Sequence, residues 1–284
     1  MESSESIEKQ VNANRQVTMK LSVILIGYNS WHFLEKNLVS LAFLQQRKDT
    51  EIIYVDNAST DHTISEIARL YPNITVIRNA KNKGVSIARN QGIRKATGDY
   101  IWILDSDTEV SETALDVMLA FMDEHPEAGL CGCKMYGQDG CVQSSCRKFP
   151  SITGKIKTGI RIISNKLRNR TDSSLKNDYD TDTKQPFEVD YVIGACQLIR
   201  KTAQERVGEL DENIFYGPED ADFCLRLKQA GYKVFYFPQI SIYHAYQRVS
   251  SHKIFSKLTW RHLQGLVYYF RKHRFPPDTI RQQQ

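Results

Sequence analysis

Long apolar runs are missing from this sequence of 284 residues. No stretch approaches the roughly 18 consecutive apolar residues that a membrane-spanning helix requires. The N-terminal segment is polar and lacks the apolar core of a secretory leader. We therefore expect residues 1–18 to form a polar extension, and we expect a cytoplasmic protein or a peripheral one at the inner face of the cytoplasmic membrane.

Glycine-rich phosphate loops are also missing. Neither GxGxxG after a predicted strand nor GxxxxGK followed by Ser or Thr occurs, which argues against a dinucleotide-dependent dehydrogenase and a P-loop nucleoside triphosphatase. Residues 21–30 contain a single glycine, Gly27. This argues against a nucleotidyltransferase that holds phosphates in a glycine-rich N-terminal loop, and we set this class aside.

Cysteine is scarce, with six residues scattered through the chain and no pair spaced as CxxC. In a protein without a leader, reduced thiols are expected rather than disulfides. A zinc site formed by Cys131, Cys133, Cys141 and Cys146 is a weaker alternative, because structural zinc sites use paired CxxC knuckles.

The composition is otherwise that of a globular protein: 41% of residues are hydrophobic, 25% are charged and 10% are aromatic. This length suits one large α/β domain or two smaller domains. The net charge is +5, and it is placed unevenly. Residues 248–284 contain eight Lys and Arg and one acidic residue, Asp278, whereas the rest of the chain is close to neutral. An anionic partner is therefore expected for this tail only.

Apolar strands alternate with amphipathic helices in the first part of the chain. Strands are predicted at 21–26, 51–55, 74–77 and 100–104, and helices at 31–44, 61–70 and 85–96. Such alternation with short loops predicts a doubly wound, mostly parallel α/β sheet with helices on both faces.

The second part is less regular. A strand is predicted at 189–198, a helix at 219–230 and a strand at 232–237, while the polar segment 150–190 is expected to be a variable loop. The tail from 248 to 284 is expected to contain a basic amphipathic helix.

Polar residues follow the predicted strands where ligands of such sheets bind, at the carboxyl ends. These residues are Asn29, Asp56, Asn57, Asn82, Asp105 and Asp107. Asp105 and Asp107 can both reach a hard divalent cation, which would neutralise a diphosphate leaving group. The alternative is an acidic turn or a helix cap before Glu109.

Asp56 offers acceptor oxygens suited to the N3–H of a uracil or thymine ring. Ser59 and Asp61 either serve the same site or cap the next helix, and Ser59 is the better cap candidate. Gly84, with Arg89 a turn later, either shapes a loop near phosphates or forms a structural turn.

An acidic pair, Glu219 and Asp220, opens the predicted helix 219–230. Acidic residues in a first turn often only complement the helix dipole. In the functional interpretation, Asp220 is a general base that takes a proton from an acceptor hydroxyl, supported by Glu219 or Asp222. His244, just past the predicted strand 232–237, is either a metal ligand or a surface histidine.

Together these segments resemble a known family. The order is Ser22–Asn29, Asp56–Asp61, Asn82–Gly84, Ala88–Asn90, Leu104–Thr108, Gly194–Ala195, Val207–Asp211, Glu219–Asp222, Leu225–Leu227 and Gly231–Tyr232. The chain from about 21 to 246 is similar to inverting family 2 glycosyltransferases of the GT-A fold, in the bacterial rhamnosyltransferase-like branch. The resemblance implies a GT-A domain at 19–247, with a nucleotide-sugar half at 19–110 and an acceptor half at 111–247.

The resemblance also implies roles for individual residues. Asp105, Asp107 and His244 would hold Mg²⁺ or Mn²⁺ on the donor diphosphate, and Asp220, with Glu219, would be the catalytic residue. The nucleotide sugar would lie against Tyr28, Asn29, Asp56, Asn57, Ser59, Asn82, Gly84, Arg89, Asp105, Gly194 and Ala195. Gly194 and Ala195 would let the donor sugar and the acceptor approach the backbone.

The expected function is therefore transfer of a sugar from a dTDP or UDP donor, such as dTDP-rhamnose, to a hydroxyl of a glycan or lipid-linked acceptor in bacterial surface polysaccharide synthesis. A non-catalytic sugar-nucleotide-binding scaffold is the alternative. The tail either lies on an anionic membrane or packs on the catalytic domain or a dimer partner. A homo-oligomer is possible, and nucleic acid is not expected as a partner.

Overall fold

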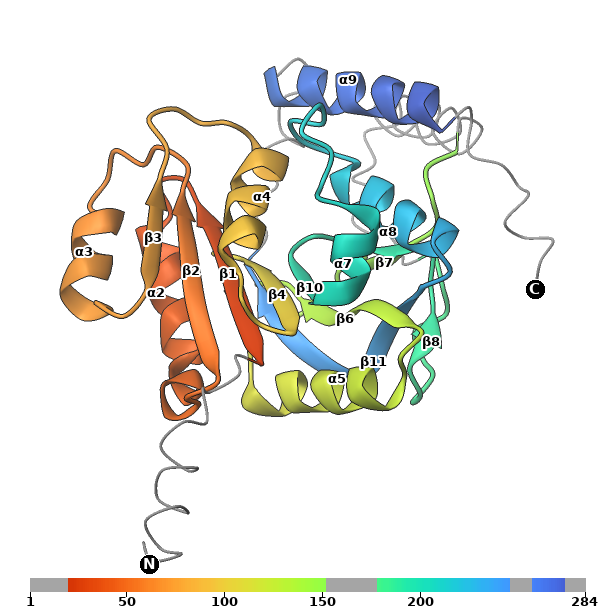
Figure 1. Cartoon of the computed structure of the whole chain (residues 1–284), viewed down its shortest axis with the longest axis horizontal. Helices are drawn as coiled ribbons and strands as arrows, with labels where there is room; N and C mark the ends of the chain where they lie inside the picture. Colours follow the sequence, from red (N-terminus) through yellow and green to blue (C-terminus); the bar gives the residue numbers. More distant parts are fainter. Residues whose placement is uncertain (1–19, 152–177, 246–256, 274–284) are drawn as a thin grey trace, which may run out of the picture.

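A computed structural model describes residues 20–151, 178–245 and 257–273 of the chain (Figure 1). The expected extension 1–18, most of the expected variable loop 150–190 and both ends of the basic tail lie outside the described residues.

The first half forms the predicted parallel layer, with strand order β3-β2-β1-β4. Its elements are β1 (Leu21–Gly27), α2 (Trp31–Ser40), η1 (Ala42–Gln46), β2 (Thr50–Asp56), α3 (Thr63–Leu70), β3 (Thr75–Arg78), α4 (Val85–Lys95) and β4 (Tyr100–Asp105). The predicted helix 31–44 is shorter than expected, because α2 ends at Ser40 and a 3₁₀ turn follows Leu41.

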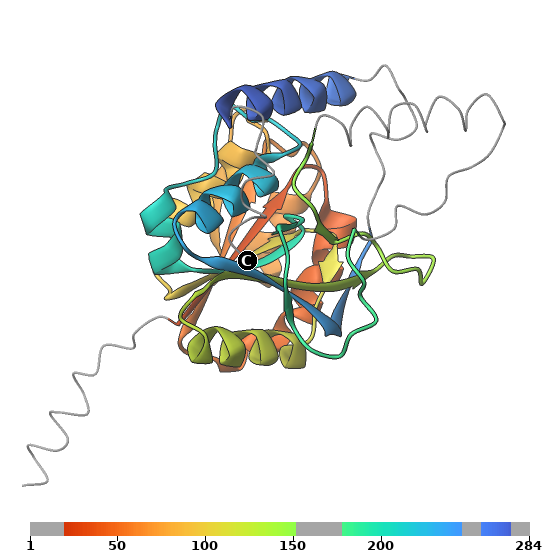
Figure 2. The same ribbon diagram turned by 90° about the vertical axis from the view of Figure 1, so that its right-hand side faces the viewer.

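Burial on both faces explains the apolar character of β1. Val23 and Leu25 pack in a cluster with Leu34 of α2, whereas Ile24 packs in a second cluster with Ala88 of α4. Alternate side chains of one strand therefore enter two cores, and a polar alternation would leave one core unfilled. Helices cover both faces of the sheet, as predicted (Figures 1 and 2).

The second half extends this layer into a mixed sheet of nine strands. Its strands are β5 (Thr108–Glu109), β6 (Ala128–Tyr136), β7 (Cys146–Arg147), β8 (Phe187–Glu188), β9 (Tyr191–Val192), β10 (Cys196–Arg200) and β11 (Lys233–His244). The order continues β4-β10-β6-β11-β5, with β10 antiparallel to β4 and β6, while β7 and β9 form a separate pair.

The helices of this half are α5 (Glu112–Glu124), α7 (Lys201–Val207), α8 (Glu219–Gln229) and α9 (Lys257–Lys272). The sequence predicted neither α5, β6 nor α7. The Ser111 hydroxyl accepts a hydrogen bond from the Ala114 N–H and caps α5. The residues after Asp107 form strand β5, so the alternative of a helix start at this point is wrong.

The predicted strand 189–198 is wrong in part. β9 pairs with β7, and β10 pairs with β4 in the main sheet. One segment thus serves two sheets, and it turns at Gly194 and Ala195 to pass from one to the other.

The predicted strand 232–237 is too short. β11 continues to His244 through a register shift between Phe237 and Ser241. Pro238 lies in this shift, where its missing N–H breaks no ladder bond. His244 is therefore the last residue of the strand rather than a residue beyond it.

The C-terminal helix α9 packs on the rest of the domain, as one of the alternatives for the tail expected. Leu266 and Tyr269 are buried, and Tyr269 belongs to the core that α4, α7 and α8 share. Both views place α9 beside α4 and α8 and away from α5 (Figures 1 and 2). In the part of the chain that the structure describes, no helix combines the length and the apolar character needed to cross a membrane.

Candidate active site

Two carboxylates and one imidazole meet beyond the end of β4. The short strand β5 pairs with the end of β11, so that Thr108 lies opposite His244. This pairing brings Asp105, Asp107 and His244 together, with one ligand atom of each within 4.8 Å of the others. Among the described residues, the cysteines form no such group, and the weaker zinc alternative is wrong.

His244 is buried, and a glutamine holds its ring. Its Nδ1 lies 2.7 Å from Oε1 of Gln143, and its Nε2 lies 3.4 Å from Oδ1 of Asp107. Nε2 of Gln143 donates to the His244 carbonyl at 2.9 Å, which fixes the glutamine in both directions. When Nδ1 donates to Gln143, the lone pair of Nε2 faces the two carboxylates.

Gln143 was not predicted as a site residue. It lies in the loop between β6 and β7, remote in sequence from His244. Sequence spacing carries no signal for such a contact.

Electrostatics at His244 reflect its two neighbours. Burial alone would lower the pKa of His244, but the hydrogen bond and charge of Asp107, followed by the charge of Asp105, raise it above its ordinary value. The carboxylates therefore create a site of negative potential, which attracts a cation.

The donor set fits Mg²⁺ or Mn²⁺. Carboxylate oxygens are the ligands that both ions prefer, and a histidine nitrogen completes the group. Gln143 supplies the outer hydrogen bond that a metal-binding histidine usually has. Asp105, Asp107 and His244 are thus the residues that could hold the ion.

Arg89 connects this group to the acidic pair at the start of α8. Its side chain is buried, and Nη2 donates to Oδ1 of Asp105 and to the carbonyl of Gly194, both at 2.8 Å. Nη1 lies 3.5 Å from Oε1 of Glu219. Burial would lower the pKa of Arg89, but the charges of Asp105 and Glu219 raise it.

Gly194 provides the space that Arg89 occupies. A Cβ built on Gly194 would lie 2.2 Å from Nη1 of Arg89, so no other residue fits without moving the guanidinium. The neighbouring Ala195 is buried, and its carbonyl accepts from the N–H of Asp105 at 3.1 Å. These two residues therefore tie the end of β4 to the start of β10.

The acidic pair is buried at the first turn of α8. Asp220 is 9% exposed, and its oxygens accept from the N–H of Gly194 at 3.2 Å and that of Ala221 at 2.8 Å. Glu219 accepts from the N–H of Gly217 at 2.7 Å.

Burial shifts both carboxylates of the pair. It raises the pKa of Glu219 to about 8, with the charge of Asp220 adding to the rise and Arg89 opposing it. Burial also raises the pKa of Asp220 above its ordinary value, against the backbone hydrogen bond of Ala221. Two adjacent carboxylates with raised pKa values are suited to proton transfer near neutral pH.

Asp222 does not support Asp220, and this alternative is wrong. Its fully buried carboxylate faces α9, with Nζ of Lys272 at 2.7 Å and Nε2 of His273 at 2.8 Å. Nε of Arg226 lies 2.9 Å away on the same helix. Helix periodicity directs residues two apart to different sides, so Asp220 faces Gly194 while Asp222 faces the C-terminal helix.

Asp56 ends β2 and is buried beneath the loop that follows. Its oxygens accept from the N–H of Ser59 at 3.2 and 3.3 Å. The Ser59 hydroxyl accepts from the N–H of Asn29 at 2.9 Å, so the expectation that Ser59 caps α3 is wrong. Asp61 holds that helix start instead, because Oδ1 accepts from the N–H of Thr63 at 3.1 Å.

Asn29 joins the loops after β1 and β2. It adopts φ 50°, and its Oδ1 accepts from the N–H of Thr60 at 2.7 Å. Tyr28, directly before it, is 52% exposed at the same end of β1. An exposed aromatic ring thus lies one residue beyond Gly27, which pairs with Asp56 at the ends of β1 and β2.

Asn57, Asn82 and Gly84 form the loop that starts α4. Nδ2 of Asn57 donates to Oδ1 of Asn82 at 3.1 Å, and that oxygen accepts from the N–H of Gly84 at 2.9 Å. Gly84 has φ 88° and lies against Phe215. A Cβ at this position would be only 2.7 Å from the Phe215 ring, so a larger residue would not fit. These interactions shape the loop, as the structural interpretation of Gly84 expected.

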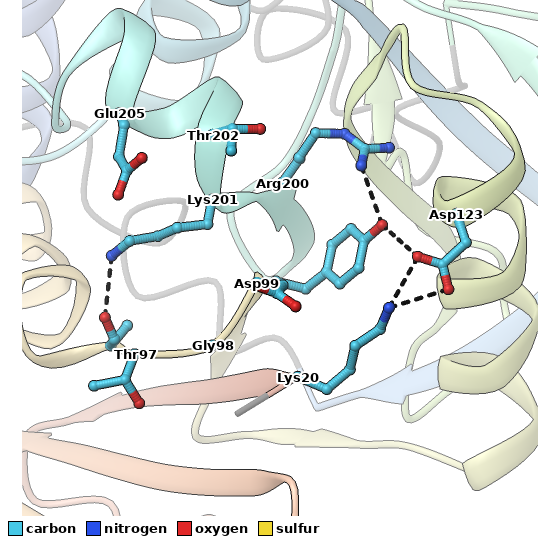
Figure 3. A pocket seen from close by; sticks show the side chains of 11 residues that line it. Lys20, Thr97, Gly98, Asp99, Asp123, Arg200, Lys201, Thr202 and Glu205 are labelled. Atoms are coloured by element: carbon cyan, nitrogen blue, oxygen red, sulfur yellow. Dashed lines mark hydrogen bonds and ion pairs between the residues drawn. The ribbon is translucent and has the colours of Figure 1, made fainter. Parts of the chain in front are cut away.

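A hollow of about 720 Å³ lies at the opposite end of the strands from these residues, where β1 and β4 begin (Figure 3). Its charged groups contact one another: Nζ of Lys20 lies 3.0 Å from Asp123, and Tyr100 donates to Asp123 at 2.7 Å. Arg200 donates to the Tyr100 hydroxyl at 3.1 Å. This hollow contains none of the predicted site residues.

Comparison with known proteins adds a family to this geometry. The sequence profile described as glycosyl transferase family 2 matches residues 22–208. The N-acetylglucosaminyl-diphospho-decaprenol L-rhamnosyltransferase of Mycobacterium tuberculosis is 26% identical over 270 residues, which cover 90% of this chain and 86% of that protein.

Two solved structures share the fold. GalNAc-T7 with UDP, GalNAc and Mn²⁺ has a TM-score of 0.63 and 17% identity over 91% of this chain, which spans 51% of that chain. The mannosyltransferase PcManGT of Pyrobaculum calidifontis, with GDP-Man and Mn²⁺, has a TM-score of 0.59 and 20% identity over 91% of this chain and 65% of that one. At these identities the likeness shows a GT-A-like fold.

Proposed function

The chain belongs to glycosyl transferase family 2 and is a glycosyltransferase of the rhamnosyltransferase-like kind. On this premise we propose that it is a metal-dependent, inverting enzyme. It transfers a sugar from a dTDP or UDP donor, such as dTDP-rhamnose, to a hydroxyl of a glycan or lipid-linked acceptor. The process that it serves is the synthesis of a bacterial surface polysaccharide.

The observation that carries this proposal is the position of Arg89. One buried guanidinium contacts Asp105 at 2.8 Å and Glu219 at 3.5 Å, and its acceptor Gly194 donates to Asp220 at 3.2 Å. The cation-binding carboxylates and the acidic pair are therefore parts of one network. A donor diphosphate at the first group would place its sugar toward the second.

Asp220 is the catalytic base in this proposal. It removes the proton of the acceptor hydroxyl as the oxygen attacks the anomeric carbon, and the bond from that carbon to the diphosphate oxygen breaks on the opposite face. The nucleoside diphosphate leaves, and the proton remains on Asp220. A raised pKa makes this carboxylate a stronger base than an exposed aspartate.

A divalent cation held by Asp105, Asp107 and His244 would neutralise the negative charge of the departing diphosphate. Arg89 keeps Asp105 oriented, and Gln143 keeps the Nε2 atom of His244 facing the carboxylates. The chain's own contribution is thus a rigid set of ligands.

The base of the donor is proposed to lie between Tyr28 and Asp56. A buried carboxylate at the end of β2 can accept the N3–H that uracil and thymine share, and the exposed Tyr28 ring can stack on the base. Both UDP and dTDP satisfy these contacts, and Asn29 with Ser59 fixes the two loops around them.

The acceptor proposal rests on the mycobacterial relative, whose name describes rhamnose transfer to N-acetylglucosaminyl-diphospho-decaprenol. The alignment with this relative covers 90% of the chain and 86% of the relative, so the similarity extends over nearly the whole of both proteins. A saccharide on a polyprenyl diphosphate is therefore the first acceptor to supply.

The experiment that tests the proposal is a transfer reaction followed by NMR. Donors are dTDP-rhamnose and UDP-N-acetylglucosamine, each with a short-chain lipid-linked N-acetylglucosamine and Mn²⁺ or Mg²⁺. We expect product with an anomeric configuration opposite to that of the donor, and none from the D220N variant. A product that retains the donor configuration would contradict single displacement by Asp220.

A further inference from the structure

The C-terminal helix α9 has two apolar faces, and only one is covered. Its inner face buries Gly265, Leu266 and Tyr269. On the same side, Nζ of Lys272 lies 2.7 Å from the carboxylates of both Asp211 and Asp222. These ion pairs hold the end of the helix against α8 and the segment before it.

The outer face carries three large apolar side chains in the open. Trp260 is 62% exposed, Leu263 is 50% exposed and Val267 is 44% exposed. These positions are three and seven residues apart, so they form a single stripe along the helix. Exposing a stripe of this kind to water is unfavourable unless another surface covers it.

The charge around the stripe is of one sign. The sequence of α9 contains Lys257, Arg261, Arg271 and Lys272 and no acidic residue. Within the described ranges, neither Arg261 nor Arg271 forms an ion pair, and Arg261 lies over the Phe215 ring at 3.6 Å. A covering surface that matches the stripe is therefore both apolar and anionic.

The helix lies against the segment that leads into the catalytic pair. A Cβ on Gly217 would meet Nδ1 of His262 at 2.3 Å, and Gly265 packs near Pro218. Tyr268 donates to Asp211 at 3.1 Å. Whatever binds the outer face of α9 is thus held on the side of the molecule where Glu219 and Asp220 lie.

We propose that this outer face, defined by Trp260, Leu263, Val267 and Arg271, binds the surface of an anionic lipid bilayer. The helix lies in the plane of the interface, with the stripe among acyl chains and Arg271 at the phosphates. A second copy of the chain fits less well, because pairing two such faces would bring cationic side chains together.

The inference goes beyond the proposed function, and its test uses neither donor nor acceptor. Trp31 and Trp102 are 8% and 0% exposed, so Trp260 is the tryptophan that a lipid can reach among the chain's three. Its fluorescence therefore reports binding directly.

The experiment titrates the full chain with vesicles of phosphatidylcholine alone or with added phosphatidylglycerol. We expect a blue shift of Trp260 emission and quenching by brominated acyl chains, with anionic vesicles only. Raising the salt concentration should weaken the binding, because the phosphate contacts are screened.

Variants locate the surface. Replacing Leu263→Ser and Val267→Ser together should lower partitioning at least about tenfold, and Arg271→Gln should lower it about fivefold. The matched controls are Val39→Ser, 62% exposed on α2, and Arg206→Gln, exposed on α7, neither of which should change binding. Circular dichroism of each variant checks that the fold is intact.

Three outcomes would overturn the inference. They are no blue shift with anionic vesicles, equal partitioning of the double variant and the original chain, and a soluble dimer that the double variant abolishes. Because none of them involves nucleotide binding or transfer, the proposed function would stand in each case.

Discussion

The loops after β1 and β2 and the network around Arg89 lie along the same sheet, but their interactions differ in kind. In the loops, amide, hydroxyl and carboxylate oxygens accept mostly from backbone N–H groups, as Asn82 does from Gly84 and Asp56 does from Ser59. Around Arg89, buried charges from distant parts of the chain face one another. Hydrogen bonds to the backbone thus set the geometry of the first region, whereas the geometry of the second depends on charge balance.

The largest expected effect is at the acidic pair. Asp220→Asn removes the proposed base and should lower kcat by about 10²–10⁴-fold with little change in donor affinity. Glu219→Gln is the matched control, because it removes the neighbouring carboxylate of the buried pair and leaves Asp220 with its hydrogen bond from Gly194. Steady-state kinetics should leave this variant within about tenfold of the original enzyme. Equal losses in both variants would contradict the assignment of the base.

The charge balance itself is tested by Arg89→Met. Removing the buried cation leaves the carboxylates of Asp105 and Glu219 without their common partner, and the free energy of unfolding should fall by about 3 kcal/mol. Arg94→Met is the control on the same helix, since Arg94 is 51% exposed and its ion pairs should contribute at most about 1 kcal/mol. Urea unfolding measures both. Similar losses would show that the buried network has no special role.

A smaller effect is expected from the glutamine behind His244. Gln143→Ala removes the bond that holds Nδ1, so Mn²⁺ affinity should fall by about 10–100-fold. Gln45→Ala, exposed in the 3₁₀ turn, should leave it unchanged. Titration calorimetry with MnCl₂ alone gives the affinities. Unchanged Mn²⁺ affinity in the Gln143→Ala variant would contradict the proposal that Gln143 orients His244 as a metal ligand.

The smallest effect concerns Asp222 and pH. Although burial opposes it, the bond from His273 and the charges of Arg226 and Lys272 lower the pKa of Asp222 from 3.8 to about 2. A depressed folded-state pKa stabilises the fold above the unfolded pKa, and this stabilisation is lost as pH falls. About 2 kcal/mol should therefore disappear between pH 4 and pH 2. Asp222→Asn should remove this part of the pH dependence in thermal unfolding. If the stability of the variant falls with pH as steeply as that of the original chain, other groups cause the pH dependence.

Sequence patterns predicted the elements around the first region well and the charge network incompletely. The strands and helices up to Asp105 lie close to their expected positions, because apolar periodicity and loop residues determine them locally. β6 and α5 were not predicted. The strand predicted at 232–237 ended before Pro238, whereas β11 continues past a register shift to His244. Gln143 was not predicted, because a contact between a loop and the end of a distant strand leaves no spacing to recognise.

The same distinction applies to residue roles. Asp105, Asp107 and His244 meet as the family resemblance implied. The side chain of Asp222, however, faces Lys272 at the end of α9 and His273 rather than Asp220. A glycine is needed at position 194 because a Cβ there would collide with the guanidinium of Arg89. Both facts follow from tertiary packing, which no motif records.

The most direct test of the central claim is a thermal-shift titration with dTDP and UDP, with and without Mn²⁺. A ligand that binds the native state at ~100 times its Kd adds about 2.7 kcal/mol of stability. The account predicts a stabilisation by one of these nucleotides that needs the ion and is lost in Asp107→Ala but kept in Asp220→Asn. A nucleotide shift of equal size without the ion, or in the Asp107→Ala variant, would contradict it.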